Sequence, residues 1–197
     1  MKTPIPLAEK YGAILENERV LTSHVAGEVI DKPRLSLWMI MMPIFFVFYY
    51  FQFQRYKNGL RSFKRDFIRT REHVLDAALQ AAANNQEINI EELVAAGNAP
   101  EQAREAYRSL IAELAAFYQT LLEAEGHDYP SLVQVSYRKK SNYLIVLNKI
   151  TLLEHQLNRA LLPGFDPGDE RTTLAVETIE KSTANFRRSQ AKEVFAR

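Results

Sequence analysis

One apolar segment constrains the fold of this chain more than any other feature. Residues 35–53 read LSLWMIMMPIFFVFYYFQF and contain no charged side chain. As a helix, these nineteen residues would measure roughly 28 Å, which is close to the hydrocarbon thickness of a bilayer. The segment therefore predicts a helix that spans or enters a membrane.

Aromatic residues near both ends of the segment support a membrane anchor. Trp38 lies near its amino-terminal end, and Tyr49, Tyr50 and Tyr56 lie near the other end, as expected for rings that settle at two headgroup layers. Pro43 lies almost at the centre, where its missing N–H would kink a helix or form the apex of a re-entrant loop. Both membrane geometries stay open. A buried helix in a soluble core is the alternative, although the segment has no polar stripe for a wet face.

Cations follow the apolar segment closely and predict its orientation. A basic collar is formed by Arg55, Lys57, Arg61, Lys64 and Arg65. Fewer cations precede the segment, so the positive-inside rule predicts that its carboxyl-terminal side is cytoplasmic. Cations beside a bilayer also attract anionic headgroups, so the collar is expected to contact lipid. Nucleic acid is not an expected partner, because the formal net charge is only +1.

Composition and periodicity predict an all-α chain. Glycine and proline number only 7 and 8, which is typical of long helices joined by short turns. The expected parts are an N-terminal amphipathic helix in 1–34, a membrane segment in 35–54, an antiparallel bundle of about three long helices in 55–162, and a linker with a C-terminal helix in 163–197. The C-terminal helix is expected to pack loosely, because its apolar residues form no continuous stripe.

The most regular helix is expected after Asn98, where Pro100 and Glu101 suit a first helical turn. Its apolar residues recur at steps of three and four until Gly126, as in a coiled coil. The helix-packing seam comprises Tyr107, Leu110, Leu114, Phe117 and Leu121. The spacing leaves open whether this seam packs within the chain or against another subunit.

Capping and turn residues predict the limits of the other helices. One helix is expected to end near Asn84, and a short one to follow with Asn89 as its cap and Gly97 at its end. A third long helix is expected from Ser131 to Leu161, although the alternation in 133–137 leaves a short strand open.

No sequence pattern identifies a catalytic or metal site. Phosphate-binding glycine loops, serine-hydrolase elbows and paired-histidine zinc motifs are absent from the sequence. The chain has no cysteine, which excludes disulfides, thiolate ligands and cysteine nucleophiles. His24, His73, His127 and His155 lie in four separate segments. We therefore expect no catalytic residue, no metal and no cofactor.

These features favour a membrane-anchored helical adaptor, scaffold or accessory subunit without catalytic activity. Its expected partners are membrane lipids and either another protein or a second copy of the chain, bound through helices. The alternative is a membrane redox subunit that binds a quinone or haem, because the anchor is rich in aromatic residues and has His24 and His73 on its flanks. A third hypothesis is a soluble helical enzyme whose apolar segment is not a membrane anchor.

Overall fold

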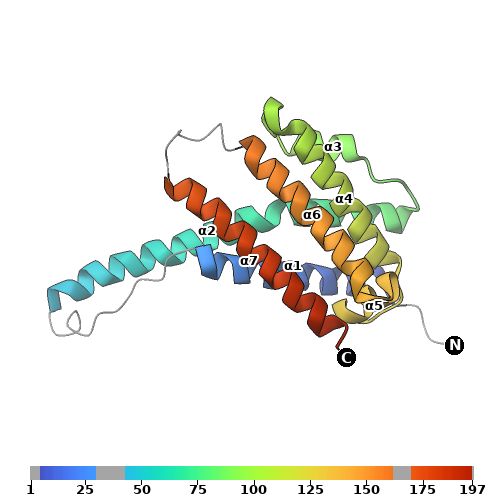
Figure 1. The fold of residues 1–197 in the computed structure, drawn as a ribbon, viewed down its shortest axis with the longest axis horizontal. Coiled ribbons are helices and arrows are strands. Elements are labelled where there is room, and N and C mark those ends of the chain that lie inside the picture. Colours follow the sequence, from blue (N-terminus) through green and yellow to red (C-terminus); the bar gives the residue numbers. More distant parts are fainter. Residues whose placement is uncertain (1–4, 30–42, 162–169, 197) are drawn as a thin grey trace.

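The computed structural model describes residues 5–29, 43–161 and 170–196, and it is built from helices (Figure 1). The described α-helices are α1 (Leu7–Val29), α2 (Pro43–Asn84), α3 (Ile90–Ala96), α4 (Arg104–Glu123), α5 (Tyr129–Tyr137), α6 (Lys140–Leu161) and α7 (Glu170–Val194), and a 3-10 turn, η2 (Glu101–Ala103), precedes α4. No strand occurs within these ranges, so the predicted all-α class is confirmed. Residues 133–137 are helical and belong to α5.

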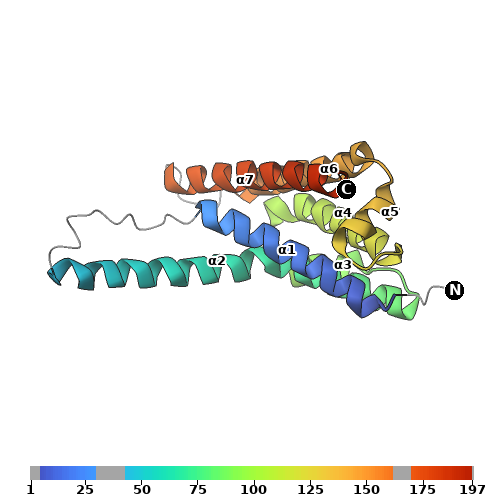
Figure 2. The same ribbon diagram turned by 90° about the horizontal axis from the view of Figure 1, so that it is seen from below.

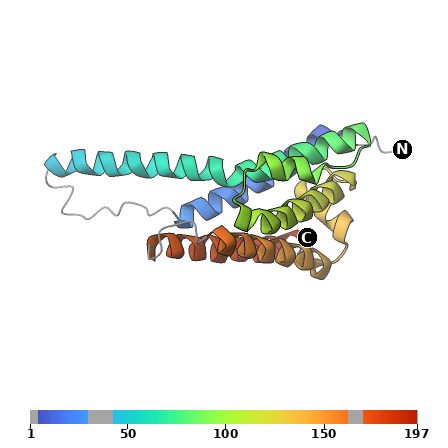
Figure 3. The same cartoon turned by 90° about the horizontal axis from the view of Figure 1, so that it is seen from above.

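The helices form two layers with α4 between them (Figures 2 and 3). On one side α1 and α2 run antiparallel, since Tyr11 donates to Asp76 while Glu18 accepts from Arg71. On the other side α6 and α7 form the second layer, and α4 contacts both α2 and α6. Contacts between α1 and α7 close the bundle, so the first and last helices belong to the same packed unit.

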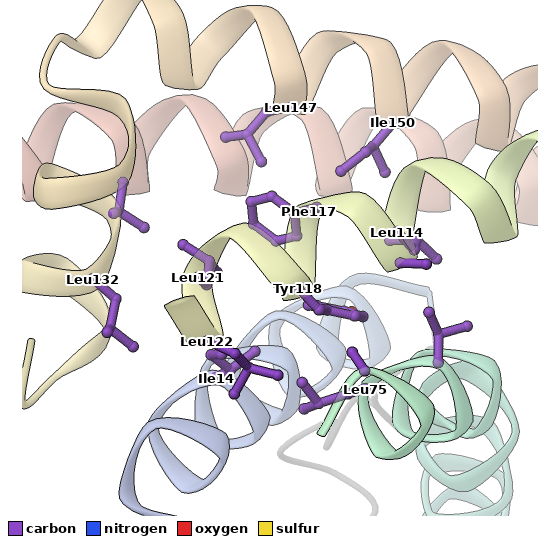
Figure 4. Packing of buried hydrophobic residues seen from close by; sticks show 14 of the residues in the cluster. Ile14, Leu75, Leu114, Phe117, Tyr118, Leu121, Leu122, Leu132, Leu147 and Ile150 are labelled. Carbon is purple, nitrogen blue, oxygen red and sulfur yellow. The ribbon is translucent and has the colours of Figure 1, made fainter. Parts of the chain in front are cut away.

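Buried side chains from all seven of the described α-helices contribute to one hydrophobic core, and Figure 4 shows part of it around α4. Ile14 of α1, Leu75 of α2 and Leu132 of α5 are fully buried there. The predicted seam also lies in this core, with Leu110, Leu114, Phe117 and Leu121 buried and Tyr107 packed against them. The seam therefore packs within this chain.

Helix α2 begins at Pro43 and so contains only part of the apolar segment. Proline suits the first turn of a helix, where an N–H has no helical partner, which is consistent with Pro43 at the start of the described helix. Trp38 and the remainder of 35–42 lie outside the described residues. Residues 43–53 supply roughly 16 Å of helix before the first cation, which is about half the thickness of a bilayer core.

The described residues include no helix that is both long enough and apolar enough to cross a membrane. The predicted membrane-inserted helix in 35–54 is therefore not supported by these helices, because α2 passes from apolar to strongly charged sequence after Phe53. Its amino-terminal part nevertheless projects well beyond the other helices (Figures 1 and 3). We call residues 43–57 the α2 arm.

Helix α7 packs more closely than its apolar pattern predicts. Ala191 and Val194 are buried, and so are the polar residues Ser182, Thr183 and Arg187. Polar side chains supply much of the buried face of α7, so the pattern of apolar residues alone underestimates how much of this helix is buried. The predicted loose packing is wrong for this helix, while residues 163–169 of the predicted linker lie outside the described ranges.

Local signals explain most helix ends. Helix α2 ends at Asn84, and α3 has the predicted cap, because the Asn89 side chain accepts from the Glu92 N–H at 3.2 Å. Gly97 is the C-cap of α3. Asn98 does not cap the next helix, since its φ is 49° and the turn η2 precedes α4.

The predicted helix from Ser131 to Leu161 is two helices. Asp128 forms the N-cap of α5 and exchanges hydrogen bonds with Ser131, so the cap lies three residues before the predicted one. Arg138 then adopts a φ of 58°, which ends α5, and α6 begins at Lys140. A long side chain at positive φ gives no sequence signal of the kind that glycine gives.

Candidate functional site

The predicted anchor and collar residues follow α2 from the arm into the bundle. The arm contains Pro43, Tyr49, Tyr50, Arg55, Tyr56 and Lys57. Further along the helix Arg61 and Arg65 are exposed and Lys64 is half-buried. Lys64 and Arg65 line a surface hollow between α1 and α2 together with Arg19. The collar therefore continues as far as the contact between these two helices.

The four histidines occupy different surroundings. The His24 ring lies 5.3 Å from the Phe186 ring, whereas His73 lines a hollow between α2 and α3. His127 is exposed between α4 and α5, and His155 Nε2 lies 2.8 Å from Glu180 Oε2. No cluster of three or more possible metal ligands occurs in the described ranges. The structure does not bring His24 and His73 into one site.

Four charged side chains form a row of alternating sign across the bundle, which we call the ion chain; three of them are buried, and the side chain of the fourth, Glu154, is 20% exposed. It consists of Glu18 of α1, Arg71 of α2, Glu154 of α6 and Arg187 of α7. Arg71 Nη1 donates to Glu18 Oε2 at 2.8 Å, and Arg71 Nη2 donates to Glu154. Arg187 donates to both Glu154 oxygens, at 2.7 and 3.0 Å. The row has no net charge and links four helices.

Arg71 and Glu154 remain ionised in the interior because their partners offset the cost of burial. Burial lowers the pKa of Arg71, but the carboxylates of Glu18 and Glu154 outweigh it and raise the pKa. Burial raises the pKa of Glu154, but Arg187 and Arg71 outweigh it and lower the pKa. Each group would become an unpaired buried charge without its partners, which is strongly unfavourable.

Neutral polar groups form a second row next to the ion chain. The hydroxyls of Tyr129 and Tyr143 lie 2.8 Å apart, and Tyr143 donates to Gln190 Oε1 at 3.2 Å. Gln190 in turn donates to Asn17. Burial raises the pKa of Tyr129 and of Tyr143, so both hydroxyls stay protonated. This row joins α5, α6, α7 and α1 by hydrogen bonds between uncharged groups.

A cavity of about 170 Å³ lies beside the ion chain, between α2, α4, α6 and α7. Its apolar walls comprise Phe67, Tyr107, Leu110, Leu114, Leu157 and Ile179. Arg71 and Glu154 of the ion chain also line it, together with Glu180 and Thr183 of α7. The cavity thus combines apolar walls with charged and hydrogen-bonding groups.

Thr183 is a polar residue of the cavity wall whose hydroxyl lacks a hydrogen-bond partner among the described residues. The residue is 3% exposed, and the oxygen without a partner is its Oγ1. Glu180, by contrast, accepts from Asn158 Nδ2 at 3.0 Å. A buried hydroxyl without a partner loses the hydrogen bonds that it makes to water in the unfolded chain.

Sequence reasoning misses the ion chain and the cavity. Its best signal is Glu18, a charged residue that interrupts the apolar spacing of Ile14, Leu21 and Val25 in α1. Arg71 is hidden among the cations of the collar region, and Arg187 lies in a helix without a continuous apolar stripe. Pairing these residues requires the arrangement of four helices in space, which their spacing along the chain does not give.

Comparison with known proteins identifies no family. No protein-family model matches the chain, and no curated protein or solved structure shows significant similarity to it.

Proposed function

We propose that the protein is a membrane-attached helical adaptor or accessory subunit without catalytic activity, whose α2 arm enters a bilayer while the bundle stays outside. The observation that carries this proposal is the projection of the arm beyond the bundle (Figure 1). The arm bears the most apolar described sequence together with Arg55 and Lys57 of the collar. An apolar end followed by cations is the arrangement expected of a helix that penetrates an anionic lipid surface.

Entry to a limited depth is compatible with the length of the apolar part. Residues 43–53 extend roughly 16 Å as a helix, enough to pass the headgroups and reach the acyl chains. A spanning or re-entrant insertion of 35–54 requires residues 35–42 to continue the apolar path. In either geometry the collar cations would lie at the lipid headgroups, with the bundle on the cytoplasmic side.

Vesicle flotation tests the lipid part of the proposal. The full chain should float with vesicles that contain anionic lipid and much less with neutral vesicles. Replacing Arg55, Lys57 and Arg61 with Gln should weaken anionic binding roughly a hundredfold, because each cation contributes about 1 kcal/mol near the surface. Lys64 and Arg65 are left unchanged because they border α1.

A matched control keeps the change in charge but moves it away from the arm. Lys181, Arg188 and Lys192 are exposed on α7, and replacing them with Gln removes the same number of cations. This variant should float like the unmodified chain. Equal loss of binding in both variants, or no anionic preference in the unmodified chain, would contradict attachment through the arm.

Exposed apolar residues on α6 support a protein partner. Ile145 and Leu152 are 65% and 57% exposed, and a spacing of seven residues places them on one helix face. The core seam is already used within the chain, so this outer face is the better candidate for a partner.

A second protein should co-purify at equal stoichiometry in mild detergent, and Ile145→Lys with Leu152→Lys should remove it. If neither a second protein nor a second copy of the chain co-purifies at equal stoichiometry, the adaptor role is contradicted.

A further inference from the structure

We propose that the cavity beside the ion chain binds a small primary amine that carries an apolar group of about six carbon atoms. The cavity lies between α2, α4, α6 and α7. This proposal goes beyond membrane attachment and does not depend on it, because its argument rests on α2 residues that lie beyond the arm, Phe67 and Arg71.

The size and walls of the cavity suit a compact hydrocarbon group. Leu110 and Leu114 line it from α4, while Leu157 and Ile179 line it from α6 and α7. Apolar cavities of on the order of 150 Å³ bind benzene in other proteins, so a volume of about 170 Å³ accommodates a group of similar size. Phe67 adds an aromatic ring, to which a cation is attracted.

The ionised groups of the wall favour a cationic ligand over an anionic one. Glu154 and Glu180 both line the cavity, and Arg71 is the cation among its lining residues. Arg71 is already paired with Glu18 and Glu154, which leaves it unable to neutralise a further anion. Glu154 is neutralised by Arg71 and Arg187, so Glu180 is the carboxylate of the wall that would repel a carboxylate ligand and attract an ammonium group.

Two side chains one turn apart on α7 can accept hydrogen bonds from the ammonium group. Glu180 has contacts to Asn158 and His155, at 3.0 and 2.8 Å, and a carboxylate has about four acceptor positions in all. Thr183 contributes the buried hydroxyl that has no partner among the described residues. Threonine in a helix has two favoured χ1 rotamers, so this hydroxyl can turn toward a bound ligand.

Calorimetric titration of the full chain with n-hexylamine and with hexanoate, at neutral pH and without lipid, tests the proposal. Hexylamine should bind saturably at one site, and hexanoate should bind at least about tenfold more weakly. Glu180→Gln keeps the shape of the side chain but removes its charge, and it should weaken hexylamine binding about tenfold. Thr183→Val should weaken it about threefold.

Glu177→Gln is the matched control, because Glu177 is exposed on the same helix and does not line the cavity. This variant should bind hexylamine as the unmodified chain does, and circular dichroism should show that all variants fold. Absence of saturable hexylamine binding by the unmodified chain would overturn the proposal. So would equal binding of hexanoate, or equal effects of the Glu177 and Glu180 substitutions.

Discussion

Arg71 pairs with two carboxylates in the interior and so links two members of the ion chain. Its guanidinium pairs with Glu18 of α1 and with Glu154 of α6, and its side chain is 6% exposed. The fixed fork of an arginine can serve two carboxylates at once, which a lysine ammonium cannot do with the same geometry. Its removal would therefore leave Glu18 without its cation and Glu154 with Arg187 alone.

Arg71→Met should lower the free energy of unfolding by about 3–5 kcal/mol, because Glu18 loses its cation in a buried site and Glu154 loses one of two. Arg104→Met is the control, since its pair with Glu101 is exposed and should contribute less than about 1 kcal/mol. Urea denaturation measures both variants. Similar losses in the two would show that the buried ion chain contributes no more than a surface pair.

Glu154 predicts the pH dependence of folding. Its pKa is lowered in the folded chain, chiefly by Arg187 and Arg71 acting against burial, so folding binds fewer protons at this site. The stabilisation is complete above the unfolded pKa of about 4.5 and is lost as the pH falls through the lower folded value.

Glu154→Gln should therefore show a smaller fall in unfolding free energy between about pH 5 and pH 3 than the unmodified chain. The exposed Glu105 provides the comparison, and Glu105→Gln should retain the original slope. Urea unfolding at several pH values gives both slopes. An unchanged slope in Glu154→Gln would mean that this carboxylate does not govern acid unfolding.

At the scale of helices, apolar periodicity is a good predictor of where helices form. It is a poorer predictor of where they end and how they pack. The seam of α4 and the limits of α3 follow from spacing and capping residues, which act within a few positions. The break at Arg138 and the close packing of α7 do not, because they depend on a positive φ and on buried polar groups. Local patterns carry little information about either.

Gly126, in the turn between α4 and α5, is required by close packing. A Cβ at this position would lie 2.7 Å from Ser131 Oγ and 2.8 Å from the Leu132 backbone nitrogen. Gly126→Ala should therefore destabilise the fold by about 1–3 kcal/mol.

Gly12 offers the opposite case within α1, because a Cβ there meets nothing within 4 Å. Gly12→Ala should stabilise the chain by about 0.5–1 kcal/mol through the better helix propensity of alanine. Thermal unfolding should shift in opposite directions for the two variants. A shift in the same direction would contradict the packing described for the turn.

At the scale of the whole molecule, a helical bundle holds one helix that projects far beyond it (Figure 2). The all-α class could be predicted from composition and heptad spacing, but the ion chain and the cavity arise where four helices meet and have no signature along the chain. The apolar segment of 35–53 predicts a membrane helix from composition alone. In the structure its described part forms the start of a longer, charged helix.

Fluorescence of a label on the α2 arm would test the central claim most directly. The chain has no cysteine, so Phe46→Cys or Glu87→Cys introduces a single site for an environment-sensitive dye. Anionic vesicles should shift the emission of the dye at position 46 to shorter wavelength, as expected in an apolar medium. The dye at exposed position 87, past the other end of α2, should not respond. Unchanged emission at position 46, or equal shifts at both positions, would contradict membrane attachment through the arm.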